Sequence, residues 1–148
     1  MFVERRVTIT LLKHICIHII LSFFLIGTAS LLPAQSGDIF SQINEANRVM
    51  AKEPDQALAL IQKALQESFD QKNKRGEGYC YNSLGAIDYQ LGRYALAINN
   101  YKKSIGIFKK IKETDGLYNS EKYLAISYEG RGELEVALSN YERLLAKI

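Results

Sequence analysis

Histidine and cysteine are scarce in this chain, and most of what is present lies near the N-terminus. Of the 148 residues, only His14, His18, Cys16 and Cys80 are of these two types. Beyond residue 36 the chain therefore lacks the commonest general base of enzymes. It keeps one thiol there, which cannot form an internal disulfide and is expected to be a small buried hydrophobe. Since zinc sites need several such ligands, the sequence predicts no catalytic residue, no metal site and no cofactor, and it argues against an enzyme.

A strong charge of one sign is also missing. The whole chain has 19 Lys and Arg against 16 Asp and Glu. Residues 1–36 contain three of the basic and one of the acidic residues, which leaves 16 basic (19 less 3) and 15 acidic (16 less 1) side chains in residues 37–148. This near balance gives no reason to expect nucleic acid as a partner.

Only one long apolar run is present, at residues 15–32. A short basic head precedes it, and the small residues of Pro-Ala-Gln-Ser-Gly follow it at residues 33–37. This order is typical of a secretory signal peptide, with cleavage expected before Gly37 or after Ala34. The alternative is an uncleaved membrane anchor, since 18 residues are near the lower limit for a membrane span. Both interpretations predict that the rest of the chain is exported, to the periplasm or the outside.

The rest of the chain resembles itself at a shift of 40 residues. A turn glycine, Gly92, recurs as Gly132, and a linker glycine, Gly76, recurs as Gly116. The recurring apolar and small positions are Ala57, Ile61 and Ala64, then Ala97, Tyr101 and Ser104, then Ala137, Tyr141 and Leu144. A fixed period in this range indicates stacked supersecondary units, and such arrays usually present an extended surface to a partner.

Each period contains two segments whose apolar residues are three and four apart, which predicts two amphipathic helices. Glycine-centred turns separate the two, at residues 91–93 and 131–133, where a helix end often needs a left-handed residue. In the first period Pro54 occupies the expected start of the second helix, a position that tolerates its missing N–H. The predicted fold is all-α: an α-solenoid of three helix-turn-helix hairpins, after an N-terminal hydrophobic segment at residues 1–36. The hairpins are expected at about residues 38–75, 78–115 and 118–148.

The middle hairpin resembles the tetratricopeptide repeat, whose pattern is W-x2-L-G-x2-Y followed by A-x3-F. The residues that carry the resemblance are Tyr81 in place of Trp, Leu84, Gly85, Ala97 and Tyr101. The third hairpin keeps fewer of these positions and has Glu121 in place of Trp, and the first is the weakest match. Because the family period is about 34 residues, the chain resembles a long-period variant.

The resemblance implies where a ligand would bind. In this family the first helix of each pair lines the concave face, where peptides bind. Carried over position by position, that face consists of Gln42, Tyr79, Asn82, Tyr89, Gln90, Asn119, Lys122 and Glu129. Their polar and aromatic side chains suit an extended or helical peptide; the alternative is a solvated face without a ligand. The implied function is a non-catalytic protein–protein interaction module.

Two further surfaces allow other interpretations. Lys102, Lys103, Lys109, Lys110 and Lys112 form a basic cluster. It is expected on the outer side as an ordinary solvated stripe, the alternative being a site for an acidic partner or lipid surface. The apolar end of the chain, at residues 144–148, predicts either self-association through the C-terminal helix or more chain beyond it. In the second case the repeats would be the extracytoplasmic sensor region of a signalling protein whose kinase or DNA-binding output part is absent from this chain.

Overall fold

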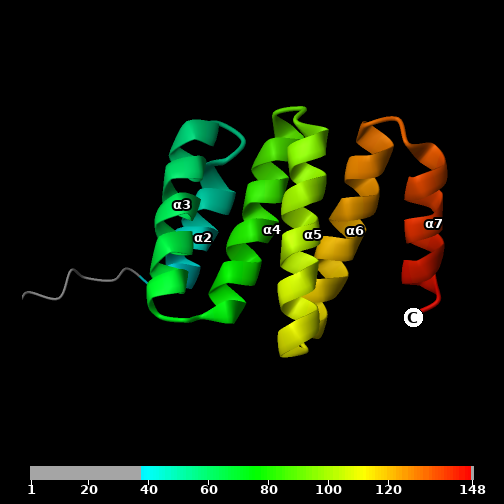
Figure 1. Ribbon diagram of the computed structural model, residues 1–148. Coiled ribbons are helices and arrows are strands. Elements are labelled where there is room, and N and C mark those ends of the chain that lie inside the picture. The colour runs from blue at the N-terminus through cyan, green and yellow to red at the C-terminus, as the bar shows by residue number, and fades with distance from the viewer. Residues whose placement is uncertain (1–37, 148) are drawn as a thin grey trace, which may run out of the picture. The chain divides into compact units, whose positions relative to one another are not determined.

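The computed structural model describes residues 38–147, and residues 37–148 form one compact unit. The predicted leader at residues 1–36 lies outside the described residues. The described part consists of six α-helices without a β-strand (Figure 1), which confirms the all-α prediction. The helices are α2 (Ile39–Val49), α3 (Pro54–Asp70), α4 (Lys74–Gln90), α5 (Tyr94–Ile111), α6 (Thr114–Gly130) and α7 (Leu134–Leu145). None of these helices is long and apolar enough to cross a membrane.

From α3 onward, the helices follow one another in equal steps. The first residues of α3 to α7 are Pro54, Lys74, Tyr94, Thr114 and Leu134, which are 20 positions apart. Each of the four turns after α3, α4, α5 and α6 has one residue with positive φ, and these residues recur at the same interval, at Lys72, Gly92, Lys112 and Gly132. The sequence repeat of 40 residues therefore spans two helices and two turns, one turn within a hairpin and one between hairpins.

The turns after α3, α4, α5 and α6 share one hydrogen-bonding pattern, which the turn between α2 and α3 lacks. In the turn after α4, the Gly92 N–H donates to Tyr89 O over 2.9 Å and the Arg93 N–H donates to Asp88 O over 2.8 Å. These two bonds are the Schellman motif, which needs a left-handed residue at the position of Gly92, where φ is +72°. The turns after α3, α5 and α6 have the equivalent bonds. The predicted role of Gly92 is confirmed, whereas lysine takes the same conformation in the turns between hairpins.

The two recurring linker glycines lie inside helices, contrary to the sequence-based expectation. Gly76 belongs to the first turn of α4, and Gly116 belongs to the first turn of α6. Asn73 caps α4, because its Oδ1 accepts the N–H of Gly76 over 2.9 Å. An asparagine cap can start a helix ahead of a glycine-rich segment, so α4 begins before the expected start of the second hairpin at residue 78.

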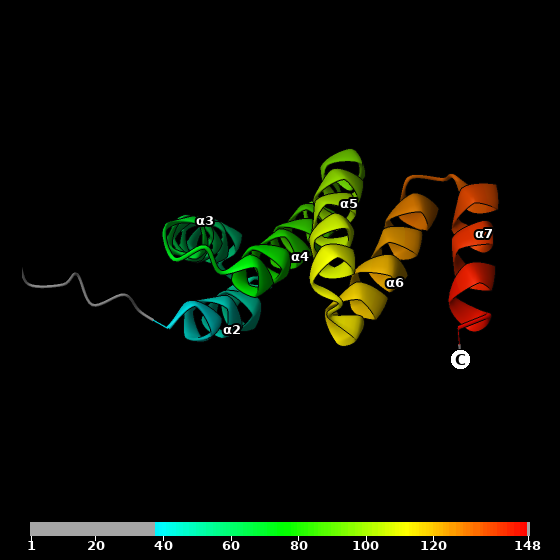
Figure 2. The ribbon, with the colours of Figure 1, turned by 60° about the horizontal axis from the view of Figure 1, so that its bottom comes forward.

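The helices alternate between two rows, as an oblique view toward their ends shows (Figure 2). The first helices of the hairpins, α2, α4 and α6, form one row, and α3, α5 and α7 form the other. Within the described residues, α2 contacts α4 and α4 contacts α6, whereas α3, α5 and α7 do not contact one another. The row of first helices is therefore the more closely spaced, inner side of the stack.

Glycines allow the helices to approach around two large buried rings. The Phe108 ring lies between α4 and α6, where a Cβ atom on Gly78 or Gly116 would be 2.6 Å from it. The Tyr101 ring covers Gly85 in the same way, at 2.8 Å. Both rings are almost completely buried. Gly85, one of the residues that carry the resemblance to the repeat, thus lies where two helices meet closely.

Candidate interaction face

The predicted ligand-binding residues are distributed over the inner row. Tyr79, Asn82, Tyr89 and Gln90 belong to α4, Asn119, Lys122 and Glu129 belong to α6, and Gln42 belongs to α2. Their surroundings differ, because some of them bond to neighbouring helices and others are open to solvent.

Gln42 lies in the interface between α2 and α3 and not on an open face. Its side chain is 8 % exposed, and its Nε2 donates to Glu67 Oε2 over 2.7 Å. The rotation of α2 about its axis explains this, since the helix turns Ile39, Ile43 and Ala46 into the core together with Gln42. Gln42 therefore holds α2 against α3.

Tyr79 contacts α2, α5 and the turn before α6 at one end of the inner row. Its hydroxyl donates to Glu113 Oε1 over 3.1 Å, and its ring meets the edges of Phe40 and Phe108 with centroids 5.9 and 4.9 Å apart. Arg75 bonds to the other oxygen of Glu113 over 3.3 Å and lies over the Phe40 and Tyr79 rings. Burial and the nearby carboxylate raise the pKa of Tyr79. The residue is thus largely engaged within the domain.

Asn82 connects α4 to α6. Its Nδ2 donates to Ser120 Oγ over 2.7 Å, and the Ser120 hydroxyl donates to Gly116 O over 2.7 Å. Ser104 of α5 lies 2.9 Å from Ser120 and donates to Gly78 O over 2.8 Å. This buried network of small hydroxyl groups was not predicted from the sequence. Ser104, which stands where the first hairpin has Ala64, was the available signal.

Tyr89 and Glu129 lie near the turns within the hairpins. The Tyr89 ring meets Tyr94 of α5 edge-on, with centroids 5.4 Å apart. Glu129 accepts a hydrogen bond from the Tyr141 hydroxyl of α7 over 2.8 Å. Burial, together with this carboxylate, raises the pKa of Tyr141 to about 12. Glu129 nevertheless remains exposed, so part of its surface is available.

The open part of the inner row is formed by Gln90, Asn119, Lys122 and Tyr123. Gln90 and Asn119 are exposed, and their side chains make no hydrogen bond within residues 38–147. Lys122 Nζ lies 4.7 Å from the centre of the Tyr123 ring. Tyr123 is 40 % exposed and stacks on Tyr101, with centroids 6.0 Å apart. Tyr123 was not among the predicted residues, although its spacing of four from Asn119 places the two on the same side of α6.

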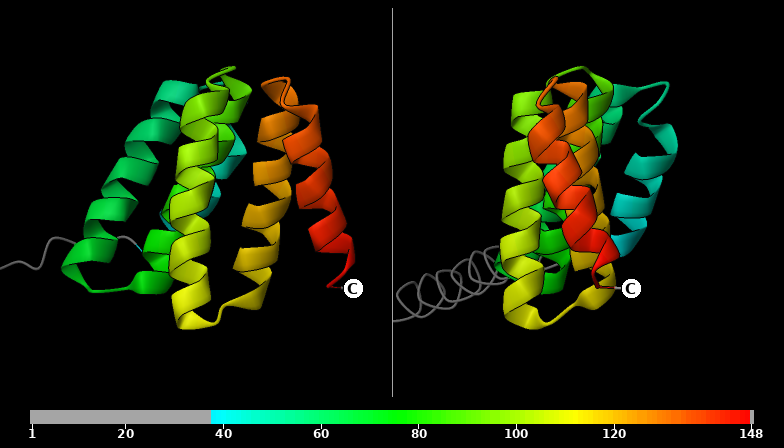
Figure 3. Two further views of the ribbon diagram at one scale, coloured as in Figure 1. Left: turned by 45° about the vertical axis from the view of Figure 1, so that its right-hand side comes forward. Right: turned by 90° about the vertical axis from the view of Figure 1, so that its right-hand side faces the viewer.

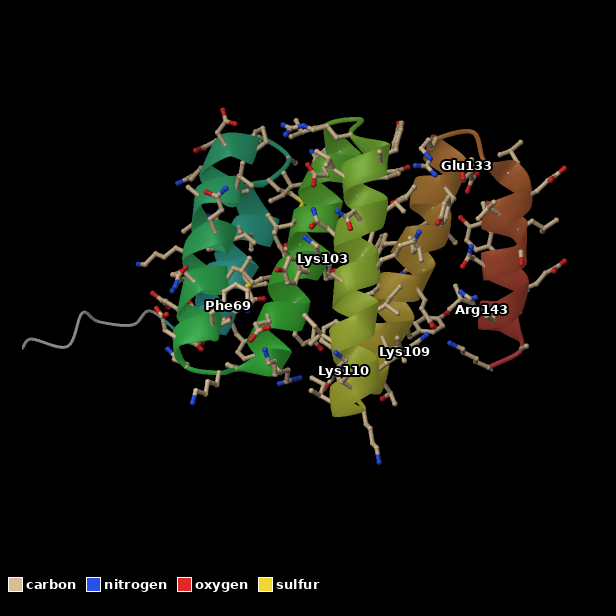
Figure 4. The ribbon with its side chains drawn as sticks, viewed as in Figure 1. Phe69, Lys103, Lys109, Lys110, Glu133 and Arg143 are labelled. Carbon is tan, nitrogen blue, oxygen red and sulfur yellow. The ribbon has the colours of Figure 1, made fainter. Side chains whose placement is uncertain are left out.

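The lysines of α5 lie on the outer row and are partly engaged. Figure 4 shows Lys103, Lys109 and Lys110 along this helix. Lys102 lies over the Tyr128 ring at 5.6 Å and Lys103 over the Tyr81 ring at 5.1 Å, while Lys109 Nζ is 3.8 Å from Glu121 Oε1. All five lysines are exposed, and three of them contact residues of neighbouring helices. The cluster therefore resembles the ordinary solvated side of a helix.

Residues 38–147 contain neither a cluster of metal-ligating side chains nor an exposed thiol. No group of three or more His, Cys, Asp or Glu side chains in residues 38–147 could hold a metal ion. Cys80 is fully buried, as expected, and burial raises the pKa of its thiol to about 11. A thiol with a raised pKa and no access to solvent is a poor nucleophile.

Comparison with known proteins agrees with the fold. Residues 79–147 match the tetratricopeptide repeat family model, whereas comparison with curated protein sequences finds no match. The crystal structure of the TPR domain of Arabidopsis FLU is similar, with a TM-score of 0.68 and 24 % identical residues. The similarity covers 74 % of this chain and 92 % of that one. The described residues therefore form a tetratricopeptide-like helical repeat domain, a kind of domain that is typical of protein–protein interaction.

Proposed function

We propose that this protein is a non-catalytic, exported interaction module that binds a peptide or protein segment along the inner row of α2, α4 and α6. One observation carries the proposal: these three helices contact one another in sequence, whereas α3, α5 and α7 do not. A single bound segment along the inner row would therefore touch several helices at once. Binding surfaces on the closely spaced side are a general property of stacked repeats.

The chemistry of the open residues supports a segment with a polar backbone and some apolar side chains. The amide groups of Gln90 and Asn119 can both donate and accept hydrogen bonds. Lys122 supplies a charge, and the exposed Tyr123 ring supplies an apolar surface with a polar tip. Tyr79 and Asn82, by contrast, position the helices that carry these groups through their bonds to Glu113 and Ser120.

Export is proposed from the sequence alone. The support is the order of a basic head, an apolar run at residues 15–32 and a small-residue exit. Mass spectrometry of the protein purified from cells tests it: a mature chain that starts at Gly37 or Gln35 is expected. A protein that keeps residues 1–36 and fractionates with the membrane would support the uncleaved anchor, and an intact chain in the cytoplasm would contradict export.

Photo-crosslinking in cells tests the binding face. A photoreactive amino acid is placed in the tagged full chain at Gln90 or Asn119, and in matched controls at Gln62 of α3 or Asn99 of α5, which are also exposed. We expect one recurrent protein partner to crosslink from the two inner positions and not from the two outer ones. Equal crosslinking from inner and outer positions would contradict the proposal, as would a lack of crosslinks from the inner positions.

Alanine variants then separate binding from folding. Asn119→Ala is expected to weaken binding of that partner while helicity and melting temperature stay unchanged, because the side chain makes no hydrogen bond within the described residues. Asn99→Ala should change neither. Normal binding by Asn119→Ala, Gln90→Ala and Lys122→Ala together would show that the ligand lies elsewhere.

The second candidate is the sensor region of a signalling protein, with self-association through the C-terminal helix. The exposed apolar side chains of α7 favour it. With the photoreactive residue placed at Leu138 of α7 instead, adducts that join only copies of this chain would support this candidate over the adaptor.

A further inference from the structure

The outward side of α7 is an apolar surface at the end of the stack. Among the described helices, α3 lies against α2 and α4, and α5 against α4 and α6, but α7 contacts α6 alone (Figure 3). Leu134, Leu138 and Leu145 of α7 are 64, 59 and 69 % exposed. Their spacing of four and seven places them on one helical stripe, which is here called the α7 stripe.

The internal repeat shows what this stripe contacts when it is covered. The residues 40 positions before Leu138 and Leu145 are Ile98 and Ile105 of α5, which are only 4 and 9 % exposed. They belong to the same core cluster as Leu124 and Tyr128 of α6. The side of α5 that corresponds to the α7 stripe is thus covered by residues of the following helix.

The neighbours of Ile98 and Ile105 identify that covering helix as α6. Lys102 and Lys109, each one turn further along α5, reach the Tyr128 ring at 5.6 Å and Glu121 at 3.8 Å, both on α6. An amphipathic helix with an apolar pair four residues apart, as Leu124 and Tyr128 are, therefore fits this side of a second helix.

Negative charge beside the α7 stripe favours some amphipathic helices over others as its partner. Glu135 and Glu142 lie three residues before and four residues after Leu138, on the same flank of the stripe. Both are exposed, and neither forms an ion pair with another residue between 38 and 147. The corresponding positions of α5 are Ala95 and Lys102. A helix seated on the α7 stripe would face two carboxylates, which favours lysine or arginine on its flank.

A second copy of this chain suits the α7 stripe less well. Antiparallel pairing of two α7 helices would bring Glu135 of each copy toward Glu142 of the other, and like charges at such positions repel. Stacking of α2 of a second copy on α7 would place its exposed Ser41, Asn44 and Asn47 on the leucines, which leaves the apolar surface without an apolar partner.

We propose that the α7 stripe binds a basic amphipathic helix of another protein, with apolar residues four apart against Leu134, Leu138 and Leu145 and with Lys or Arg beside Glu135 and Glu142. This surface is separate from the inner row and is independent of the function proposed above. In this mode of binding, a helix lies against an apolar helical surface; buried apolar side chains provide affinity, and charged side chains set the orientation.

Two labelled peptides test the proposal by fluorescence anisotropy with the full chain. The first has the sequence of α6 with Glu121→Lys and Glu129→Lys, which turns its net charge from −2 to +2; the second is the unchanged sequence. We expect the basic peptide to bind more tightly. The double variant Leu138→Gln/Leu145→Gln should weaken its binding by about tenfold or more. Leu96→Gln, at a leucine of α5 that is 50 % exposed, is the matched control and should have no effect.

The charge is tested by Glu135→Lys/Glu142→Lys, which should weaken binding of the basic peptide and strengthen binding of the acidic one. Equal affinity for the basic peptide in the wild type and in the leucine variant would overturn the proposal, and so would a failure of the full chain to bind it. Sedimentation of the chain alone provides the remaining outcome. A dimer of the wild type that the leucine variant does not form would show that a second copy covers the α7 stripe. This result would also overturn the proposal.

Discussion

Two glycines in neighbouring helices should respond oppositely to the same substitution. Gly85 lies in the middle of α4, where a Cβ atom would be 2.8 Å from Cε1 and Cζ of Tyr101. The Tyr101 ring is 1 % exposed, and Tyr123 stacks on it, so it cannot easily move away. Gly106 lies in the middle of α5, where a Cβ atom would meet nothing within 4 Å. The pair thus separates helix propensity from packing.

The expected magnitudes follow from these surroundings. Alanine is favoured over glycine inside a helix by roughly 0.5–1 kcal/mol, so Gly106→Ala should raise the free energy of unfolding by that amount. Gly85→Ala has the same gain, but an additional methyl group in a packed site costs about 1–3 kcal/mol. Because the helix term is common to both variants, their free energies of unfolding should differ by the packing cost alone. At about 4 °C per kcal/mol for a domain of this size, the difference is measurable as a shift in melting temperature.

Urea and thermal unfolding followed by far-ultraviolet circular dichroism are the assays. The order of stability should be Gly106→Ala, then wild type, then Gly85→Ala. If Gly85→Ala were as stable as Gly106→Ala, the Tyr101 ring would not be held against α4, and the account of how the second hairpin closes would be refuted.

Three further outcomes are expected. Gly92→Ala should lower the free energy of unfolding by roughly 1 kcal/mol, because φ is +72° and the site is otherwise empty. Lys112→Gly, at φ +58°, should raise the free energy of unfolding. Equal unfolding midpoints for the two variants would contradict this expectation. Cys80 should react with a thiol reagent at about pH 8 only after unfolding, because the thiol is buried and its pKa is raised to about 11; rapid labelling of the native protein would disprove it. The fold favours the protonated form of Tyr141. The contribution of this residue to stability is therefore complete below the ordinary tyrosine pKa of 10 and is lost as the pH rises through about 12. Unfolding measured at several pH values should show that Tyr141→Phe lacks this part of the loss of stability at alkaline pH.

The local features of the fold were predictable from the sequence. The spacing of apolar residues predicted the hairpins, Pro54 marks the start of α3, and Gly92 and Gly132 mark the turns within hairpins. The conformation of Lys112 was not predictable in this way. The Schellman bonds, from Glu113 N to Phe108 O and Lys112 N to Lys109 O, set its left-handed φ, and they act on the backbone whatever the side chain.

The surroundings of the predicted face depend on contacts between distant residues. Gln42 is buried because α2 is rotated toward α3, where Glu67 accepts its bond, and a weak first repeat pattern does not define that rotation. Asn82 and Ser120 are 38 positions apart, and their bond depends on how far α4 and α6 are shifted along each other. Helical spacing alone indicates which residues share a side of a helix, but not which of them a neighbouring helix engages. The role of this face in binding stays a prediction.

The way the helices contact one another has a consequence for how the domain opens. Among the described helices, every contact is with the next helix or the one after it, so no contact closes the two ends on each other. Unfolding can therefore proceed one hairpin at a time from either end, with amide hydrogens of α4 and α5 exchanging last and those of α7 among the first. A ligand that spanned the inner row would link the hairpins and slow exchange at the ends as well as beneath it. Hydrogen exchange along the chain would then report occupancy of the inner row even before the ligand is identified.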